Sequence, residues 1–476
     1  MRTARAPASP AGPRVTRPPT DIAPPQPGRP VCSVPFRPAG LACREAVAAA
    51  FASGALPVLP PVPGCFQTMI SFAIPVFHAR GLRAAWSLAT AALLAACGGG
   101  EPAAPDGGGG GVGTLRLSLT DAPACGYREV FVTVERVRVH RSSSAEPDDA
   151  GWREVVLPAP QRVDLLELTN GTLLPLGQLE LPAGAYTQMR LVLSPNTAAA
   201  PLANAVTPLG GTTVALTTPS AARSGLKMNV SLQVPAGQVA DVAIDFDACR
   251  SLVRAGKSGK VLLKPVLRVI PIVSPAGQRV VGYVDPALAT GATTVSVQSA
   301  GVPVRATPPD PAGRFVLYPV PPGRYDLVLT APGRVNAVMT DVPVSEATTT
   351  LVGHVNLRLD PPAALMSHEV SGTVTVRGST ADTGGAVRAM QTFTGGPTVE
   401  VGHAAADDLT GAYALTLPAG APVRAVYAAG ATGFGFTPDT AAAGRYRLEA
   451  AAPGYAAQGL DVELTVDVTR NFVFGP

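Results

Sequence analysis

Short stretches in which apolar and polar residues alternate dominate the chain from about residue 113 onward. Every second position from Leu115 to Leu119 is apolar, and so is every second position from Val130 to Val134. A period of two predicts strands with one buried face. The alternation resumes at Val137 one residue out of phase, which a β-bulge would explain.

Turn-forming sequences separate these stretches. Asp121-Ala122-Pro123 follows the first, and Asn170-Gly171 is a strong turn signal further on. Later strands are predicted over 188–193, 226–234 and 239–246. Glycine and proline each occur 50 times, and no long stretch has helical periodicity. Short strands separated by turns predict an all-β fold of tandem β-sandwich domains.

The N-terminal 68 residues do not fit this pattern. Residues 1–68 are rich in proline, alanine and arginine, a composition that predicts disorder rather than a packed core. Either translation begins near Met69, or a long leader precedes an export signal. We favour the start near Met69, because export signals lie at the N-terminus.

Residues 69–96 have the organisation of a secretory signal peptide. Arg80 and Arg83 precede an uncharged stretch, 84–96, that ends in small residues directly before Cys97. That stretch is too short for a transmembrane helix, which needs roughly 20 apolar residues. The sequence Leu94-Ala95-Ala96-Cys97 resembles the lipobox of bacterial lipoproteins.

The lipobox resemblance implies that the signal peptide is cleaved before Cys97 and that Cys97 carries a diacylglycerol anchor in a membrane. Because Gly98 rather than aspartate follows, the resemblance points to the outer membrane, facing the periplasm or the cell surface. Residues 97–112 are rich in glycine and predict a flexible tether.

Removal of residues 1–96 changes the charge balance. The whole chain has 37 basic and 33 acidic residues, and the leader holds nine of the bases but only two of the acids. The remaining 28 basic and 31 acidic residues give a slightly acidic protein, which argues against nucleic acid as a partner.

The cysteines divide by position. Three lie in the leader, and Cys97 is the predicted lipid site. The remaining two, Cys125 and Cys249, are an even number in an exported chain and predict a disulfide. Two unpaired thiols are the alternative.

Several motifs in order resemble the DUF4382 family of bacterial lipoproteins over residues 113–272. They are Thr114-Leu115-Arg116-Leu117-Ser118-Leu119-Thr120-Asp121-Ala122-Pro123, Leu179-Glu180-Leu181-Pro182-Ala183-Gly184-Ala185-Tyr186, Ile244-Asp245-Phe246-Asp247-Ala248-Cys249 and 262–270. The resemblance implies a β domain and carries no catalytic residues.

Residues 276–360 and 366–476 resemble two copies of the carboxypeptidase regulatory-like domain, a transthyretin-like sandwich with a carbohydrate-binding-like fold. The matching segments are Asp310-Pro311-Ala312-Gly313-Arg314-Phe315 and Asp408-Leu409-Thr410-Gly411-Ala412-Tyr413. The second copy is more divergent and carries a longer alanine- and glycine-rich insertion. The resemblance is to the accessory sandwich and implies no zinc enzyme.

Candidate metal and nucleotide sites are weak. Asp241, Asp245 and Asp247 alternate along one strand and could bind Ca²⁺, although a solvated outer face is favoured. The segment Gly256–Lys260 superficially resembles a phosphate loop but lacks its first glycine, so we expect a turn with solvated lysines. No cofactor is expected.

The sequence favours a non-enzymatic envelope or surface protein with a binding or structural role. The ligand is unknown, and a glycan or an envelope protein is a possible partner. Aromatic residues beside turn glycines could form a glycan platform, although a structural role is commoner: Trp152, Tyr186, Tyr325, Tyr413 and Tyr455. The alternative is a hydrolase or accessory component acting on envelope or environmental polysaccharide.

Overall fold

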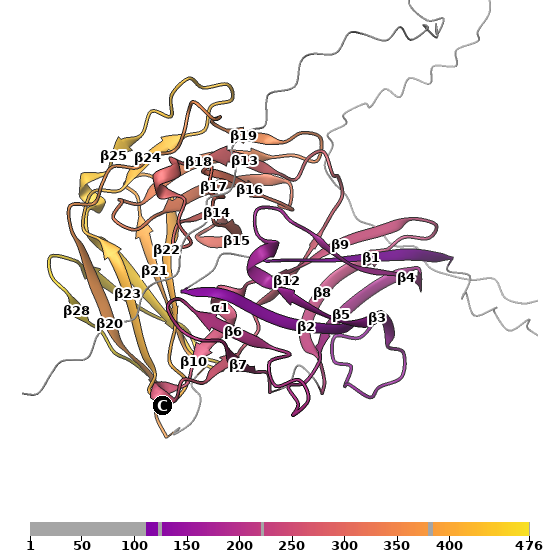
Figure 1. Ribbon diagram of the computed structural model, residues 1–476. Helices are drawn as coiled ribbons and strands as arrows, with labels where there is room; N and C mark the ends of the chain where they lie inside the picture. Colours follow the sequence, from indigo (N-terminus) through magenta and orange to yellow (C-terminus); the bar gives the residue numbers. More distant parts are fainter. Residues whose placement is uncertain (1–110, 122–125, 220–222, 379–383, 476) are drawn as a thin grey trace, which may run out of the picture. The chain divides into compact units, whose positions relative to one another are not determined.

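The computed structural model describes residues 111–121, 126–219, 223–378 and 384–475, which all belong to one compact unit, 99–476. This part is nearly all β and forms multiple sheets, which confirms the predicted all-β class of tandem β-sandwiches (Figure 1). The predicted leader, Cys97 and Cys125 lie outside the described residues. The domain boundaries stay a prediction.

The first sandwich has a sheet of four strands and a sheet of eight. The smaller has the order β12-β9-β1-β4, comprising β1 (Val112–Asp121), β4 (Leu174–Pro182), β9 (Val239–Phe246) and β12 (Leu267–Pro271). The larger has the order β10-β11-β7-β6-β2-β5-β8, with β3 pairing β2. Its strands are β2 (Tyr127–His140), β3 (Arg153–Asp164), β5 (Gly184–Leu193), β6 (Ala205–Pro208), β7 (Val214–Thr217), β8 (Leu226–Val234), β10 (Leu252–Arg254) and β11 (Val261–Leu263).

The alternating residues of the first sandwich form its core. Leu115, Leu117 and Leu119 of β1 are fully buried, as are Val132 and Val134 of β2. The register of β2 against both β3 and β5 shifts after Val134, so the predicted β-bulge is confirmed. Short helical turns connect some of the strands: η1 (Leu165–Leu168), α1 (Ala248–Ser251) and η2 (Gly256–Ser258).

Two further sandwiches follow and share one strand topology. In the second, the order β16-β13-β19 faces β15-β14-β17-β18. In the third, the order β23-β20-β28, with β29 also on β20, faces β22-β21-β26-β27. The second sandwich comprises β13 (Val280–Tyr283), η3 (Pro286–Leu288), β14 (Thr294–Ser299), β15 (Val302–Thr307), β16 (Arg314–Leu317), β17 (Gly323–Thr330), β18 (Ala337–Val344) and β19 (Thr350–Val352). The third comprises β20 (Ser367–Val376), β21 (Ala386–Thr392), β22 (Thr398–Ala405), β23 (Ala412–Pro418), η4 (Thr440–Ala442), β26 (Arg445–Ala451), β27 (Gln458–Glu463), β28 (Val468–Thr469) and β29 (Phe472–Phe474).

Matching glycines mark the same turn in both copies. Gly313 and Gly411 have φ values of 82° and 68°. A Cβ would lie 2.2 Å from the carbonyl oxygen of Val284 at Gly313, and 2.3 Å from that of Val374 at Gly411. Each glycine oxygen accepts a 2.8 Å hydrogen bond from the amide of the same valine. Only glycine fits here, because a side chain would collide and strain the backbone.

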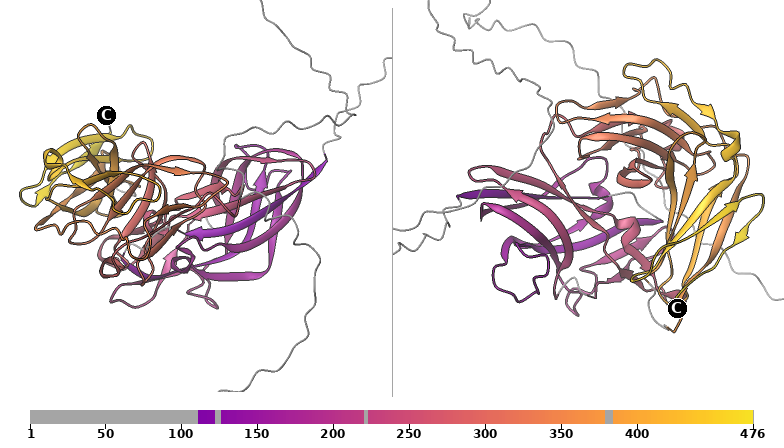
Figure 2. Two further views of the ribbon diagram at one scale, coloured as in Figure 1. Left: turned by 90° about the horizontal axis from the view of Figure 1, so that it is seen from above. Right: turned by 180° about the vertical axis from the view of Figure 1, so that it is seen from behind.

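The insertion in the second copy extends a sheet of the first copy. β24 (Val423–Val426) pairs in parallel with β18, and β25 (Thr437–Pro438) pairs with β24 (Figures 1 and 2). Val423 belongs to the core of the second sandwich. The sheet that begins with β15 therefore contains strands from both sides of the predicted boundary between 360 and 366.

Candidate functional site

The three aspartates proposed for calcium have separate cationic partners. Asp241 lies 3.2 Å from Arg116 of the adjacent strand β1, and Asp247 lies 3.2 Å from Arg250. Asp245 is 4% exposed, so the expected solvated position is wrong for this residue. Among the described residues, no group of three or more histidines, cysteines, aspartates or glutamates could hold a metal ion.

Asp245 is buried because Arg305 of β15 reaches it from the second sandwich. The Arg305 guanidinium donates to the Asp245 carboxylate, to the hydroxyl of Thr120 at 2.6 Å and to the carbonyl oxygen of Asp121 at 2.9 Å. The Arg305 side chain is 1% exposed. A buried charge needs such partners, because each charge left without them costs several kcal/mol.

The third sandwich is joined to the first through the loop after β22. Lys264 Nζ lies 2.7 Å from Asp408 Oδ1, and the amide of Gly256 donates to Asp407 Oδ2 at 2.7 Å. The amide of Asp408 also donates to the carbonyl oxygen of Arg254. These contacts hold the turn between β10 and β11 against the third sandwich.

A series of alternating charges runs from α1 across the outer face of the third sandwich. Arg250 of α1 pairs with Glu400 of β22, whose other oxygen lies 3.8 Å from Arg388 of β21. Arg388 binds Glu449 of β26 at 2.5 Å, and Arg447 lies 3.6 Å from the same carboxylate.

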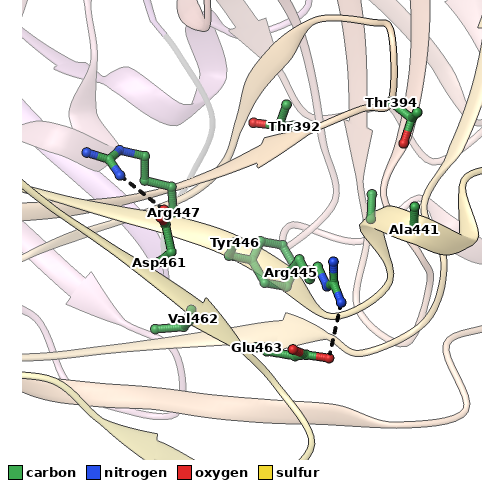
Figure 3. A pocket seen from close by; sticks show the side chains of 10 residues that line it. Thr392, Thr394, Ala441, Arg445, Tyr446, Arg447, Asp461, Val462 and Glu463 are labelled. Carbon is green, nitrogen blue, oxygen red and sulfur yellow. Dashed lines mark hydrogen bonds and ion pairs between the residues drawn. The ribbon is translucent and has the colours of Figure 1, made fainter.

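The series ends in a shallow groove of about 490 Å³ (Figure 3). Arg447 of β26 lies 3.0 Å from Asp461 of β27, and Arg445 lies 3.8 Å from Glu463. Tyr446 lines the groove but is only 3% exposed, so its ring offers little surface for stacking. The groove therefore presents charged and hydroxyl groups rather than an aromatic platform.

A cavity of about 210 Å³ lies beside Arg250 and Glu400, the most buried pair of this series of charges. Asp247, Arg250, Gln298, Glu400 and His403 contribute to its lining. Desolvation raises the pKa of both carboxyls, against the opposing charge of Arg250, which contacts each of them. Desolvation also lowers the pKa of His403 to about 3, so its imidazole is neutral at neutral pH.

Cys249 lies in α1 and lines both this cavity and a larger one of about 770 Å³. Because Cys125 lies outside the described residues, the disulfide between Cys249 and Cys125 stays a prediction. Cys97 cannot be placed for the same reason.

Most of the candidate aromatic residues have structural roles. The Tyr186 hydroxyl donates to the carbonyl oxygen of Pro182, and that of Tyr325 to Pro321, each four residues upstream. Both are tyrosine corners that follow a Pro-x-Gly-x-Tyr sequence. Tyr413 is 5% exposed, whereas Tyr455 is 42% exposed.

Trp152 is the remaining aromatic candidate and is partly buried. The guanidinium carbons of Arg138 and Arg190 lie 4.7 and 5.1 Å from its ring centroid. Its indole nitrogen donates to the carbonyl oxygen of Glu146 at 2.8 Å. Trp152 therefore holds the loop between β2 and β3 and does not form an open platform.

Sequence reasoning missed the residues that join the sandwiches. Arg250, Arg305 and Glu400 occupy ordinary helix or strand positions, and the partners that they contact on another sandwich lie 60 or more positions away in the sequence. The local sequence pattern contains no signal for such pairs.

The described residues include no helix with the length and apolar character that spanning a membrane requires.

Residues 112–265 match the family model described as "Domain of unknown function (DUF4382)". This match agrees with the resemblance over the first sandwich. No curated protein sequence matches the chain. The resemblance of the later sandwiches to the carboxypeptidase regulatory-like domain stays a prediction.

Several solved structures resemble parts of the chain weakly. One is a type II cohesin–X-dockerin complex of Acetivibrio cellulolyticus, with 19% identity over 19% of this chain, 60% of that chain and a TM-score of 0.17. A putative adhesin from Bacteroides ovatus has 8% identity over 42% of this chain and 93% of its own, with a TM-score of 0.16. The major pilin of Corynebacterium diphtheriae has 11% identity over 76% of this chain and 99% of its own, also with a TM-score of 0.16. TM-scores this low do not establish a shared fold or function.

Proposed function

We propose that this chain is a lipid-anchored envelope or surface protein with a non-enzymatic structural or binding role. Cys97 carries the lipid, and the sandwiches stand beyond the glycine-rich tether. A glycan or an envelope protein is the expected partner. The folded part contributes a fixed spacing between joined sandwiches.

The observation that carries the proposal is the burial of Arg305 against Asp245. A hinge motion that separated these two residues would break the ion pair together with the hydrogen bonds from Arg305 to Thr120 and Asp121. The joint is therefore expected to stay closed during function. A fixed joint suits a spacer or a rigid binding surface.

The anchor is tested by Cys97→Ala in the native host. We expect loss of labelling by a radioactive or alkyne-bearing fatty acid, together with release from the membrane fraction. Glu101→Ala is the control, because it changes a residue of the tether without touching the lipobox or the predicted disulfide. Unchanged membrane fractionation of the Cys97 variant would refute the anchor.

The non-enzymatic role is tested with the purified, lipidated full chain and a panel of envelope polysaccharides and envelope proteins. We expect retention of a partner without release of new reducing ends. Arg305→Met should weaken retention if the fixed joint shapes the binding surface. Efficient cleavage of any polysaccharide would overturn the non-enzymatic assignment.

One observation favours the hydrolase alternative. Asp247 and Glu400 line the same 210 Å³ cavity, and burial raises the pKa of both carboxyls. Glycoside hydrolysis commonly uses two carboxyl groups, one of them with a raised pKa. Against this, Arg250 contacts both side chains.

Carboxyl variants distinguish the hydrolase role from the non-enzymatic role. If the chain cleaves a polysaccharide, Asp247→Asn and Glu400→Gln should each abolish cleavage while retaining the fold. Glu463→Gln is the control, since that carboxylate belongs to an exposed ion pair. If no cleavage is found with the wild-type chain, the carboxyl pair is structural.

A further inference from the structure

Three of the four lysines in the whole chain, Lys257, Lys260 and Lys264, fall within eight residues. Arg254 precedes them at the end of β10, so the turn between β10 and β11 is strongly basic. Lys264 is paired with Asp408. The side chains of Arg254, Lys257 and Lys260 form no ion pair between sandwiches in the described part of the chain.

Arg254, Lys257 and Lys260 line one cavity of about 240 Å³ together with Tyr127 and Pro208. All of its lining residues belong to the first sandwich, and none carries a carboxylate. The volume is that of about eight liquid waters, at roughly 30 Å³ each. A group of several heavy atoms can therefore enter it.

The three cationic side chains are exposed, and none forms an ion pair with a residue in the described part of the chain. The two nearby acidic side chains already have other partners. Asp407 accepts hydrogen bonds from the amides of Gly256, Leu409 and Thr410, and Asp408 pairs with Lys264.

The back of the turn is held in place while its cations remain available. The Asp407 contact fixes Gly256, and Ser258 donates to the carbonyl oxygen of Ala255 at 2.5 Å. Gly259 adopts a left-handed conformation with φ of 73°. A turn held by these contacts loses little conformational freedom on binding, which favours affinity.

We propose that this turn and the 240 Å³ cavity form a binding site for a phosphate group. A phosphate monoester carries −1.5 to −2 charges near pH 7 and three acceptor oxygens, which match three cationic donors. A carboxylate offers one charge and two oxygens. Lysine binds phosphate as a point charge, while arginine can donate two parallel hydrogen bonds.

The group that bears the phosphate could be a sugar or a lipid headgroup. Tyr127 and Pro208 supply the apolar part of the lining, against which a sugar ring or glycerol backbone can pack. The site does not depend on the lipid anchor or on the fixed joint at Arg305. It goes beyond the proposed function by naming the ligand chemistry.

The experiment is a calorimetric titration of the lipidated full chain, held in a non-ionic detergent, with soluble probes. Glucose 6-phosphate represents a phosphorylated glycan, and dihexanoyl phosphatidate, which is also a phosphate monoester, represents a lipid headgroup. Glucose and glucuronate are the uncharged and carboxylate-bearing controls. The variant Arg254→Gln/Lys257→Gln/Lys260→Gln removes the site.

The control variant is Arg153→Gln/Arg223→Gln/Lys227→Gln. It removes the same net charge from exposed side chains that have no acidic partner in the described part of the chain. We expect the site variant to weaken phosphate binding at least tenfold and the control variant to leave it within twofold. Thermal unfolding of both variants checks that they remain folded.

Each outcome is decisive. Binding of glucose 6-phosphate alone assigns the site to a phosphorylated glycan, and binding of the phospholipid alone assigns it to a headgroup. The proposal is overturned if neither phosphate probe binds the wild-type chain, if glucuronate binds equally well, or if the control variant loses as much affinity as the site variant.

Discussion

Arg305 of β15 is paired with Asp245 of β9, and the pair is almost completely buried, with 1% and 6% of the two side chains exposed. Removal of the arginine alone would leave a carboxylate inside the protein without its charge partner. Removal of both would leave a smaller penalty, because apolar replacements of a buried pair are often tolerated.

We predict that Arg305→Met lowers the free energy of unfolding by about 3–5 kcal/mol, and that Arg305→Met/Asp245→Leu lowers it by less. Urea unfolding measures both. The control is Arg445→Met, whose pair with Glu463 is 63% and 62% exposed and should contribute less than about 1 kcal/mol. An equal effect of the two methionine substitutions would contradict the prediction.

His403 should make the fold sensitive to acid. Burial, aided by the charges of Arg250 and Arg388, lowers its pKa from 6.5 to about 3. Between these values the unfolded chain binds a proton that the folded chain does not, so stability falls as the pH falls through this window.

The His403→Gln variant should therefore lose less stability than the wild type between pH 7 and pH 5. Urea midpoints at the two pH values provide the comparison. His354→Gln, at an exposed loop position, is the control. If His403→Gln retains the full pH dependence of the wild type, another group is responsible.

The tyrosine corner of the second sandwich should contribute measurably to stability. Tyr325→Phe removes the 2.7 Å hydrogen bond to Pro321 while keeping the buried ring. We expect a loss of about 0.5–1.5 kcal/mol in the free energy of unfolding. Tyr455→Phe, at a position 42% exposed, should have little effect. Thermal unfolding distinguishes the two, and equal shifts would show that the corner hydroxyl is unimportant.

The cysteine pairing has a direct chemical test. We predict that non-reducing peptide mapping recovers Cys125 joined to Cys249, which are 124 positions apart. Closure of so long a loop is worth roughly 4–5 kcal/mol in the chain-entropy description, although measured values are often lower. Reduction should accordingly lower the unfolding midpoint. Recovery of a free Cys125 peptide from the oxidised protein would refute the pairing.

Strand patterns were predictable because they depend on neighbours in the chain. The alternation at Leu115, Leu117 and Leu119 identified a strand, and the phase change after Val134 identified the bulge. The turn at Gly256–Lys260 was also predicted, and the structure confirms a turn there between β10 and β11. In each case the deciding information lies within a few residues.

Contacts between sandwiches were not predictable. The acidic strand looked like a solvated face because nothing near Asp245 indicates that Arg305 will cover it. Glu400 likewise gains its role only when Arg250, 150 positions earlier, is folded against it. The lysine cluster was visible in the sequence. The cavity beside it was not, because Tyr127 and Pro208, which help to line it, come from distant strands.

The pairing of β24 with β18 has a consequence for how this protein can be divided. A chain cut between the second and third sandwiches would strip β24 and β25 from the sheet, remove Val423 from the neighbouring core and leave β18 as an exposed edge. Exposed edges promote aggregation. The two sandwiches are thus expected to unfold in one cooperative transition and to be gained or lost together, as a single heritable module, when such genes recombine.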